Sequence, residues 1–262
     1  MIGLSGKTVF ITGGGGGIGA GIAEAFAERG AKIVLADIEL GYAETEAARL
    51  PAEARARAIS LDVRSPESWQ AAREAVGAVD VLCNNAGVST GFKPLVELSA
   101  ETFERVMAIN VAGVFHGIKA FAPAMIARGS GHIVNTSSMN GLSPFGSFAA
   151  YSASKFAVLG LSDALRDELA PAGIGVSTLF PGLTRSRMSE ADSATSRGNM
   201  MEPLWLGRAV VRAVEANEPY IVTHPEYRDS LATRHARILA AFGEPAQPGY
   251  RTGPVATAIS DS

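Results

Sequence analysis

Five consecutive glycines, Gly13 to Gly17, separate a short apolar segment from a helical pattern near the start of the sequence. The apolar segment covers residues 7–12, and the helical pattern covers residues 18–29. Glycine lets the backbone adopt positive φ and approach a ligand closely, while a helix start offers unpaired N–H groups and a positive dipole end. A strand, a glycine turn and a helix in this order predict an α/β unit whose turn binds a pyrophosphate.

The same alternation of apolar segments and helical patterns continues along most of the chain. It predicts parallel strands joined by right-handed crossovers, with helices on both faces of the sheet. The expected strands are residues 7–12, 32–36, 56–61, 79–83, 131–136, 174–180 and 219–223, and the expected helices include residues 18–29, 66–76, 101–128 and 151–170. The predicted fold class is therefore α/β, a doubly wound (Rossmann) seven-stranded parallel sheet.

We expect a single domain over residues 1–262, because no shift in composition marks a second one. Two segments break the pattern. Residues 183–205 are mostly polar and are predicted to form a flexible substrate lid. Residues 244–262 are rich in proline, glycine and small residues, and this composition predicts an irregular tail.

Composition excludes several classes of partner. A net charge of −3 argues against nucleic acid or an anionic membrane surface. No apolar run reaches the ~18 residues of a membrane-spanning helix, and the N-terminus does not resemble a signal peptide. Cys83 is the single cysteine, so no internal disulfide is possible, and a cytoplasmic location is expected. No histidine and cysteine pair has the spacing of a zinc site, so no metal is expected.

The acid that follows the second expected strand indicates which dinucleotide binds. Asp37 comes directly after residues 32–36, where a carboxylate can accept hydrogen bonds from both hydroxyls of an adenosine ribose. It would repel a 2′-phosphate, and no arginine or lysine lies in the glycine turn or directly after Asp37 to attract one. NAD is therefore predicted over NADP, although a solvated loop carboxylate would look the same in the sequence.

Tyr151 and Lys155, in the run Tyr-Ser-Ala-Ser-Lys, are four residues apart and would share one face of a helix. An ammonium group beside a phenol favours the phenolate, so the pKa of Tyr151 is predicted to fall below its ordinary value of about 10. Such a tyrosine exchanges a proton near neutral pH. The same spacing also occurs by chance on solvated helix faces, so the other motifs decide its meaning.

Together these motifs resemble those of the short-chain dehydrogenase/reductase family, in its short single-domain branch, over residues 5–240. The motifs are Thr12-Gly13-x-x-x-Gly17-Ile18-Gly19, Asp62-Val63, Asn84-Asn85-Ala86-Gly87, Asn110, Ser138, Tyr151-Ser-Ala-Ser-Lys155 and Pro181-Gly182. The resemblance implies NAD-dependent interconversion of a secondary alcohol and a ketone. It also implies a homotetramer built from dimers through the helices expected at residues 101–128 and 151–170.

The resemblance implies a catalytic role for each member of a tetrad. Tyr151 would be the general acid/base, and Lys155 would lower its pKa and hold the nicotinamide ribose. Ser138 would bind the substrate oxygen, and Asn110 would help to hold a water in a proton relay. Ser137 is the alternative residue for binding the substrate oxygen, but the spacing to Tyr151 favours Ser138.

The resemblance also implies a set of cofactor-binding residues. They are Gly13, Gly17, Ile18, Gly19, Asp37, Asp62, Val63, Asn84, Ala86, Gly87, Tyr151, Lys155, Pro181, Gly182 and Thr184. One motif departs from the family pattern Pro-Gly-x-Val-x-Thr, because Thr184 takes the valine position and Ser186 takes the threonine position. Which of these two hydroxyls would contact the nicotinamide stays open.

Apolar residues near the tetrad indicate the substrate class. The predicted substrate residues are Ser138, Phe145, Phe148, Tyr151, Leu183 and Met188. A pocket wall formed by these apolar side chains suits a hydrophobic, cyclic or aromatic alcohol or ketone. Alternatively, Phe145 and Phe148 only pack beneath their loop, and Arg185 and Arg187 bind a carboxylate at the entrance.

Two other functions remain open: a reductase of 3-oxoacyl thioesters and a protein that binds NAD without turnover. The negative net charge does not favour the basic docking surface that the first would use. The complete tetrad argues against the second. Among the histidines, His116 is expected in a core or interface, His132 in a surface turn, and His224 in a structural role, with a subunit contact as one version of it.

Overall fold

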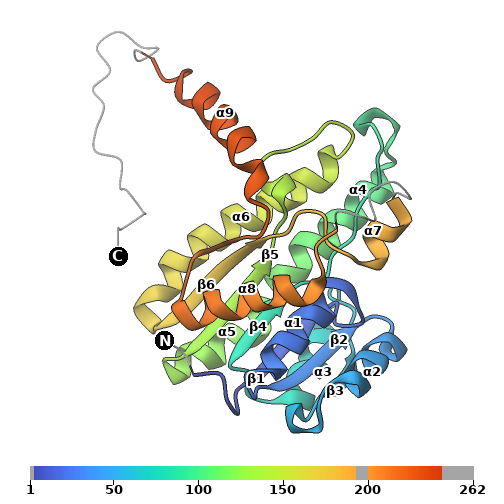
Figure 1. The fold of residues 1–262 in the computed structure, drawn as a ribbon, viewed down its shortest axis with the longest axis vertical. Coiled ribbons are helices and arrows are strands. Elements are labelled where there is room, and N and C mark those ends of the chain that lie inside the picture. The colour runs from blue at the N-terminus through green and yellow to red at the C-terminus, as the bar shows by residue number, and fades with distance from the viewer. Residues whose placement is uncertain (1–2, 193–199, 244–262) are drawn as a thin grey trace.

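Seven parallel strands form one sheet through the middle of the molecule (Figure 1). The computed structural model describes residues 3–192 and 200–243. The strands are β1 (Thr8–Thr12), β2 (Lys32–Asp37), β3 (Arg57–Ser60), β4 (Val81–Asn84), β5 (Gly131–Thr136), β6 (Ile174–Phe180) and β7 (Tyr220–Val222). Their order is β3-β2-β1-β4-β5-β6-β7, which confirms the predicted doubly wound sheet. The predicted tail at residues 244–262 and residues 193–199 of the predicted lid lie outside the described part.

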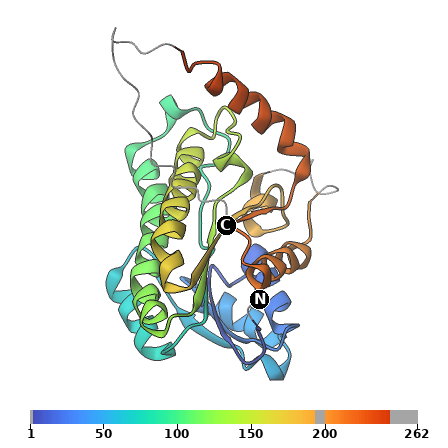
Figure 2. The same ribbon diagram turned by 90° about the vertical axis from the view of Figure 1, so that its left-hand side faces the viewer.

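Helices cover both faces of the sheet (Figures 1 and 2). The helices are α1 (Gly17–Ala27), α2 (Leu40–Arg49), α3 (Pro66–Val76), α4 (Ala100–Met107), α5 (Gly113–Arg128), α6 (Ala149–Leu169), α7 (Arg187–Asp192), α8 (Pro203–Ala216) and α9 (Arg228–Leu239). Helices α1, α2 and α8 share one apolar core with the sheet, and α3, α5 and α6 share the other. Successive side chains of β1 alternate between these cores, with Val9 and Ile11 in the first and Phe10 in the second.

Local sequence signals explain where several helices begin. Ser65 accepts a hydrogen bond from the Ser68 amide at 3.0 Å, and Pro66 occupies the first turn of α3. Ser99 caps α4 in the same way, through the Thr102 amide at 3.2 Å. These caps satisfy N–H groups that have no partner within the helix.

The helix predicted over residues 101–128 is interrupted. Residues Ala108–Ala112 form a π-helical segment between α4 and α5, and Asn110 lies within it. The run Ala100–Arg128 is long and apolar enough to cross a membrane by length and composition, with an 18-residue window whose mean hydropathy is 1.3. Polar residues interrupt this run, so the sequence does not show it as one continuous apolar segment. Helix α5 packs its apolar side on the sheet through Val114, Ile118 and Phe121, as a core helix does.

The reversal of strand order beside β1 determines where a ligand can bind. The chain leaves β1 toward β2 and β3 on one side and returns to β4 on the other. The loops after β1 and β4 therefore diverge at the carboxyl ends of the strands, which opens a crevice at that edge. The predicted pyrophosphate turn lies in this crevice.

His132 lies inside β5, and the predicted position in a surface turn is wrong. Its side chain is fully buried, with Nε2 2.8 Å from Ser177 Oγ. Gly175 is its neighbour on β6, and a Cβ there would come within 2.3 Å of His132 Nδ1. The absence of a side chain at residue 175 therefore makes room for the imidazole, a tertiary effect that the sequence around His132 does not reveal.

Burial of His132 predicts an acid-sensitive contribution to stability. Burial lowers the pKa of His132 from 6.5 to about 4, so the imidazole is neutral in the folded chain and charges on unfolding. Its contribution is fully present above the unfolded pKa and is lost as the pH falls toward the folded pKa. Between pH 7 and pH 5 the loss is about 2 kcal/mol.

Urea titrations of wild type and His132→Gln at the two pH values test this expectation. The free energy of unfolding of the wild type relative to the variant should fall by about 2 kcal/mol on going to pH 5. The subtraction removes the titration of carboxyl groups that both proteins share. An unchanged difference would contradict the assignment.

Candidate active site

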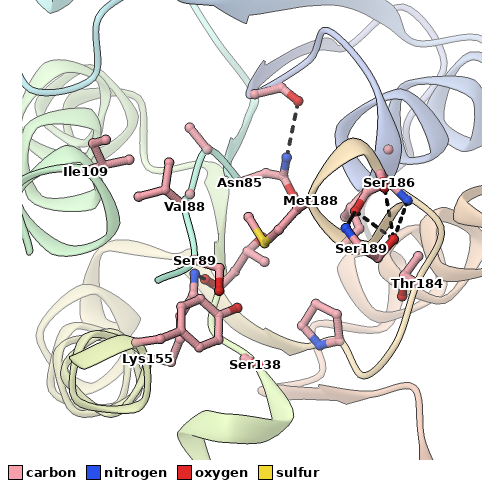
Figure 3. Close-up of a pocket in the computed structure, with 18 of the residues that line it drawn as sticks. Asn85, Val88, Ser89, Ile109, Ser138, Lys155, Thr184, Ser186, Met188 and Ser189 are labelled. Carbon is pink, nitrogen blue, oxygen red and sulfur yellow. Dashed lines mark hydrogen bonds between the residues drawn. The ribbon is translucent and has the colours of Figure 1, made fainter. Parts of the chain in front are cut away.

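One cavity of about 980 Å³ opens at the carboxyl ends of the central strands (Figure 3). It brings together the glycine turn, the ends of β2, β4 and β5, the first turn of α6 and residues 181–189. Such a volume and such convergence of polar and apolar groups are typical of a cofactor and substrate site. The predicted catalytic, cofactor and substrate residues line this cavity, apart from three described below.

The glycine turn forms the floor of one end of the cavity. Gly13 and Gly17 have φ of 63° and 52°, where other residues are strained. Helix α1 begins at Gly17, and no side chain caps it. Its first N–H groups therefore have no partner within the helix. A Cβ at Gly15 would lie 2.6 Å from Tyr42 Cβ, so only glycine lets the turn pack against Tyr42. The unpaired N–H groups at the start of α1 suit a pyrophosphate.

Asp37 stands at the predicted ribose position. Its Oδ2 accepts a hydrogen bond from the Gly15 amide at 2.9 Å, and its Oδ1 accepts one from the Glu39 amide at 3.1 Å. The carboxylate lines the cavity and retains lone pairs for a ligand. The two amides hold it in place, which disfavours the alternative of a freely solvated loop residue.

Asp62 and Val63, which are predicted to bind the cofactor, line the same cavity as Asp37. The Arg64 side chain hydrogen-bonds Asp62 and holds the pKa of that carboxyl below its ordinary value. The Val63 carbonyl accepts a hydrogen bond from Trp69 Nε1 at 3.0 Å, deep in the core. Packing against a buried tryptophan therefore anchors this edge of the cavity.

Three predicted site residues lie behind the cavity instead of lining it. Asn84 is buried in β4 and donates to Asn135 Oδ1 at 2.9 Å. Its neighbour Asn85 lines the cavity, because adjacent residues of a strand point to opposite sides. Gly19 also faces inward, and a Cβ there would lie 2.2 Å from the Gly13 carbonyl oxygen. The third is Asn110.

Asn110 is fully buried within the π-helical segment. Its Oδ1 accepts a hydrogen bond from the Val88 amide at 2.8 Å, and its Nδ2 donates to the Val88 carbonyl at 3.0 Å and to Ser154 Oγ at 3.0 Å. The side chain thus fastens the loop after β4 to α6. Local π-helix is frequent at functional sites.

Lys155 and Ser138 lie at the other end of the cavity (Figure 3), and Tyr151 lines the same cavity. Lys155 Nζ lies 5.6 Å from the centre of the Tyr151 ring and donates to the Thr136 carbonyl at 2.9 Å. Ser138 Oγ accepts from the Asn140 amide at 3.1 Å. Ser137 differs, because its hydroxyl donates to the Lys155 carbonyl at 2.8 Å and supports α6. The geometry therefore favours Ser138 as the residue that meets a substrate.

The predicted lowering of the pKa of Tyr151 does not occur in this structure. Burial raises the pKa of Tyr151, and a hydrogen bond with Ser138 opposes that change. Burial also lowers the pKa of Lys155 from 10.5 to about 8. The prediction considered only the attraction between the two groups, whereas removal of both from water disfavours both charges.

Aromatic side chains cover the substrate end. Phe145, Phe148, Leu183 and Met188 line the cavity as predicted, so the alternative that Phe145 and Phe148 only pack beneath their loop is wrong. Phe92 was not predicted, yet its ring centre lies 4.8 Å from that of Phe148 in an edge-on arrangement. Tyr227 was not predicted either, and it lies 6.0 Å from Phe145. Both come from segments without a periodic pattern, so only the fold reveals their place.

His224 fastens the loop after β6. Its Nδ1 accepts a hydrogen bond from the Gly182 amide at 3.0 Å, and its Nε2 lies 3.3 Å from the Leu183 carbonyl. A Cβ at Gly182 would overlap the imidazole at 2.4 Å. The predicted structural role thus takes the form of a contact within the chain, beside predicted nicotinamide-binding residues.

The two candidate hydroxyls after this loop both line the cavity. Thr184 is buried and donates to the Gly182 carbonyl at 3.3 Å. Ser186 exchanges hydrogen bonds with Ser189, as the dashed lines in Figure 3 show. Each hydroxyl forms a hydrogen bond within the loop. The geometry therefore leaves open which of the two would contact the nicotinamide.

The two arginines of residues 183–189 have different partners. Arg185 pairs with Glu202 at 2.9 Å. Arg187 reaches the glycine turn, where its Nη1 donates to the Gly15 carbonyl at 2.8 Å. The sequence places no basic residue in this turn or directly after Asp37. This absence applies only to residues near the turn in sequence, because the fold brings Arg187 to Gly15 although the two are 172 residues apart in the chain.

Within residues 3–192 and 200–243, no group of three or more His, Cys, Asp and Glu side chains is placed to hold a metal ion. The buried thiol of Cys83 belongs to the apolar core, and burial raises its pKa. Cys83 therefore does not contribute a reactive group to the cavity.

Residues 7–197 match the family described as short chain dehydrogenase. The chain belongs to the short-chain dehydrogenase/reductase family. It is 33% identical over 261 residues to a C alpha-dehydrogenase of Sphingobium, covering 89% of this chain and 85% of that protein. It is 36% identical over 225 residues to a 3-alpha-(or 20-beta)-hydroxysteroid dehydrogenase of Mycobacterium tuberculosis, covering 83% and 85%.

A third relative is much longer. The "Probable oxidoreductase EphD" of Mycobacterium tuberculosis is 42% identical over 181 residues, which cover 67% of this chain and 30% of that protein. The present chain therefore spans less than a third of this relative's length.

Solved structures of the family agree with the fold but differ in their cofactor. A short chain dehydrogenase/reductase from Burkholderia phymatum in complex with NAD has a TM-score of 0.85 and 31% identity, covering 97% of this chain and 99% of that one. A short-chain dehydrogenase from Sphingobium yanoikuyae in complex with NADPH has a TM-score of 0.78 and 30% identity, covering 94% and 100%.

The contact of His224 with Gly182 predicts an effect on dinucleotide binding. His224→Leu removes the acceptor for the Gly182 amide, so the dissociation constant for NADH should rise about fivefold, the worth of one hydrogen bond. His224→Asn places Oδ1 near the position of Nδ1 and should stay close to wild type. Fluorescence titration with NADH measures both, and equal affinities for the two variants would contradict the role.

Proposed function

We propose that this short-chain dehydrogenase/reductase is an NAD-dependent oxidoreductase that interconverts a hydrophobic, cyclic or aromatic secondary alcohol and its ketone. The observation that carries the proposal is the meeting of Tyr151, Ser138 and Lys155 beneath an aromatic wall, at one end of a cavity whose other end is the glycine turn. This arrangement places a proton-transfer group between a dinucleotide cradle and an apolar pocket.

Each residue of the tetrad then has its own role in the reaction. A bound nicotinamide supplies the chemistry of hydride transfer. Tyr151 takes the proton from an alcohol oxygen, or returns it to a ketone. Ser138 donates a hydrogen bond to the same oxygen and stabilises the negative charge that develops there. Lys155 keeps a positive charge near the phenol, and Asn110 positions the loop that borders the site.

Asp37 supports the choice of NAD. Two backbone amides hold its carboxylate toward the cavity, where it can accept hydrogen bonds from ribose hydroxyls and repel a 2′-phosphate. Related structures hold either NAD or NADPH, so the carboxylate of this chain, and not its family, favours NAD.

The aromatic wall supports the substrate class. Phe92, Phe145 and Phe148 surround the approach to Tyr151, and Arg187 lies at the glycine turn instead of beside these rings. Aromatic faces bind flat apolar groups, which favours an apolar substrate over one that carries a carboxylate. The likeness to a hydroxysteroid dehydrogenase points the same way.

We also propose assembly into a homotetramer. Phe103, Phe115 and Ile126 are partly exposed on α4 and α5. Apolar groups on a helical surface stabilise contacts between subunits when a second copy covers them.

Substitutions of the two serines and the tyrosine test the proposed chemistry. Tyr151→Phe should reduce turnover by 10²- to 10⁴-fold, with NADH binding largely retained. Ser138→Ala should reduce turnover by about 10²-fold, since it removes one donor to the developing charge. The matched Ser137→Ala should lower thermal stability and affect turnover far less. Retained turnover in Tyr151→Phe would contradict the role.

A substrate screen followed at 340 nm tests the reaction class and the cofactor. We expect turnover of bulky cyclic or aromatic secondary alcohols with NAD, and slow turnover of alcohols that carry a carboxylate. Oxidation should accelerate as the pH rises, because the raised pKa of Tyr151 limits the phenolate at neutral pH. NADP tested in parallel should be the poorer cofactor, and preference for acidic substrates would contradict the proposal.

A further inference from the structure

We propose that Arg187 is a specificity-determining residue of the dinucleotide site: it binds a phosphate on the adenosine ribose and opposes Asp37 in the choice between NAD and NADP. This inference rests on the proposed function, because it concerns the same cofactor. It goes beyond it, because the sequence assigns the choice to Asp37 alone and places no cation at the glycine turn.

The two opposing charges bind opposite ends of one residue. The Gly15 amide donates to Asp37 Oδ2 at 2.9 Å, and the Gly15 carbonyl accepts from Arg187 Nη1 at 2.8 Å. Both side chains line the cavity. Because both side chains contact Gly15, a ligand group held by Asp37 would lie close to the positive charge of Arg187.

Tyr42 fixes the orientation of the guanidinium. The Arg187 guanidinium carbon lies 4.0 Å above the centre of the Tyr42 ring, a close cation–π arrangement. A Cβ at Gly16 would lie 3.4 Å from Arg187 Nη1, so the guanidinium rests directly on the turn. Guanidinium carries five N–H donors in a fixed plane, and Gly15 uses one of them. The geometry suits a phosphate, which arginine binds with more than one hydrogen bond.

The preference for NAD is then a difference between two opposing interactions. A 2′-phosphate on the ribose would be repelled by Asp37 and attracted by Arg187. Neutralising Asp37 should reveal the attraction, with no new basic residue added to the chain. The attraction should disappear when Arg187 is also removed.

Four proteins measure both interactions: wild type, Asp37→Asn, Arg187→Gln and the double variant. Fluorescence titration gives the dissociation constants for NADH and NADPH without any turnover. We expect Asp37→Asn to tighten NADPH binding at least tenfold relative to NADH. Compared with Asp37→Asn, the double variant should bind NADPH about tenfold more weakly. Its dissociation constant for NADH should rise less than about threefold.

Two further variants control for general effects. Arg185→Gln removes the same charge two residues away, where the side chain pairs with Glu202, and should leave both dissociation constants unchanged. Arg187→Lys in the Asp37→Asn background retains the charge without the planar donors and should keep part of the NADPH affinity. Thermal unfolding of each variant verifies that it is folded.

The outcomes separate this inference from the proposed function. Equal weakening of NADH and NADPH by Arg187→Gln, or no effect on either, would overturn the role of Arg187 while NADH binding by wild type upholds the dinucleotide site. Failure of wild type to bind either dinucleotide would overturn both proposals.

Discussion

The whole site depends on the absence of side chains in the turn after β1, because three separate segments pack against that backbone. A Cβ at Gly14 would lie 2.8 Å from Leu35 of β2, and one at Gly17 would lie 2.7 Å from Ser186. Gly13 is equally close to the loop after β4, with Ala86 Cα 3.0 Å from the position of a Cβ. Contacts shorter than about 3 Å are not tolerated in a close-packed interior. Glycine at these positions therefore draws the second strand, the fourth strand and the loop after β6 around one anion-binding helix start.

Burial of polar groups sets the electrostatics at the other end of the cavity. Lys155 and Asn110 are buried, and each forms hydrogen bonds with the backbone, Lys155 at the end of β5 and Asn110 in the loop after β4. These bonds offset the desolvation of the side chains and hold the loops in place. The same burial opposes ionisation of both Tyr151 and Lys155. Proton transfer in this site is consequently governed by a competition between desolvation and charge attraction, and any ligand that alters the solvation of the phenol will alter that competition.

Patterns of local origin were recovered well from the sequence. Strands β5 and β6 and helix α3 have the predicted bounds, because apolar runs and a serine–proline start are properties of neighbouring residues. Which residues line the pocket was harder to predict from the sequence. Asn84 and Asn85 are adjacent, and only the direction of each side chain at the strand end separates a core residue from a cavity residue. Phe92 and Tyr227 reach the substrate wall from segments that no periodicity marks.

The sequence alone determined the fold class, the glycine turn, the acid at the end of β2 and the spacing of Ser138, Tyr151 and Lys155, because each of these is a pattern among near neighbours. Tertiary structure decided which side chains share one environment. It buried His132 beside Gly175, placed His224 against Gly182, and delivered Arg187 to the carbonyl of Gly15. It also reversed the expected change in the pKa of Tyr151. Desolvation and contact depend on distances between residues remote in the chain, and those distances exist only once the sheet and its helices have packed.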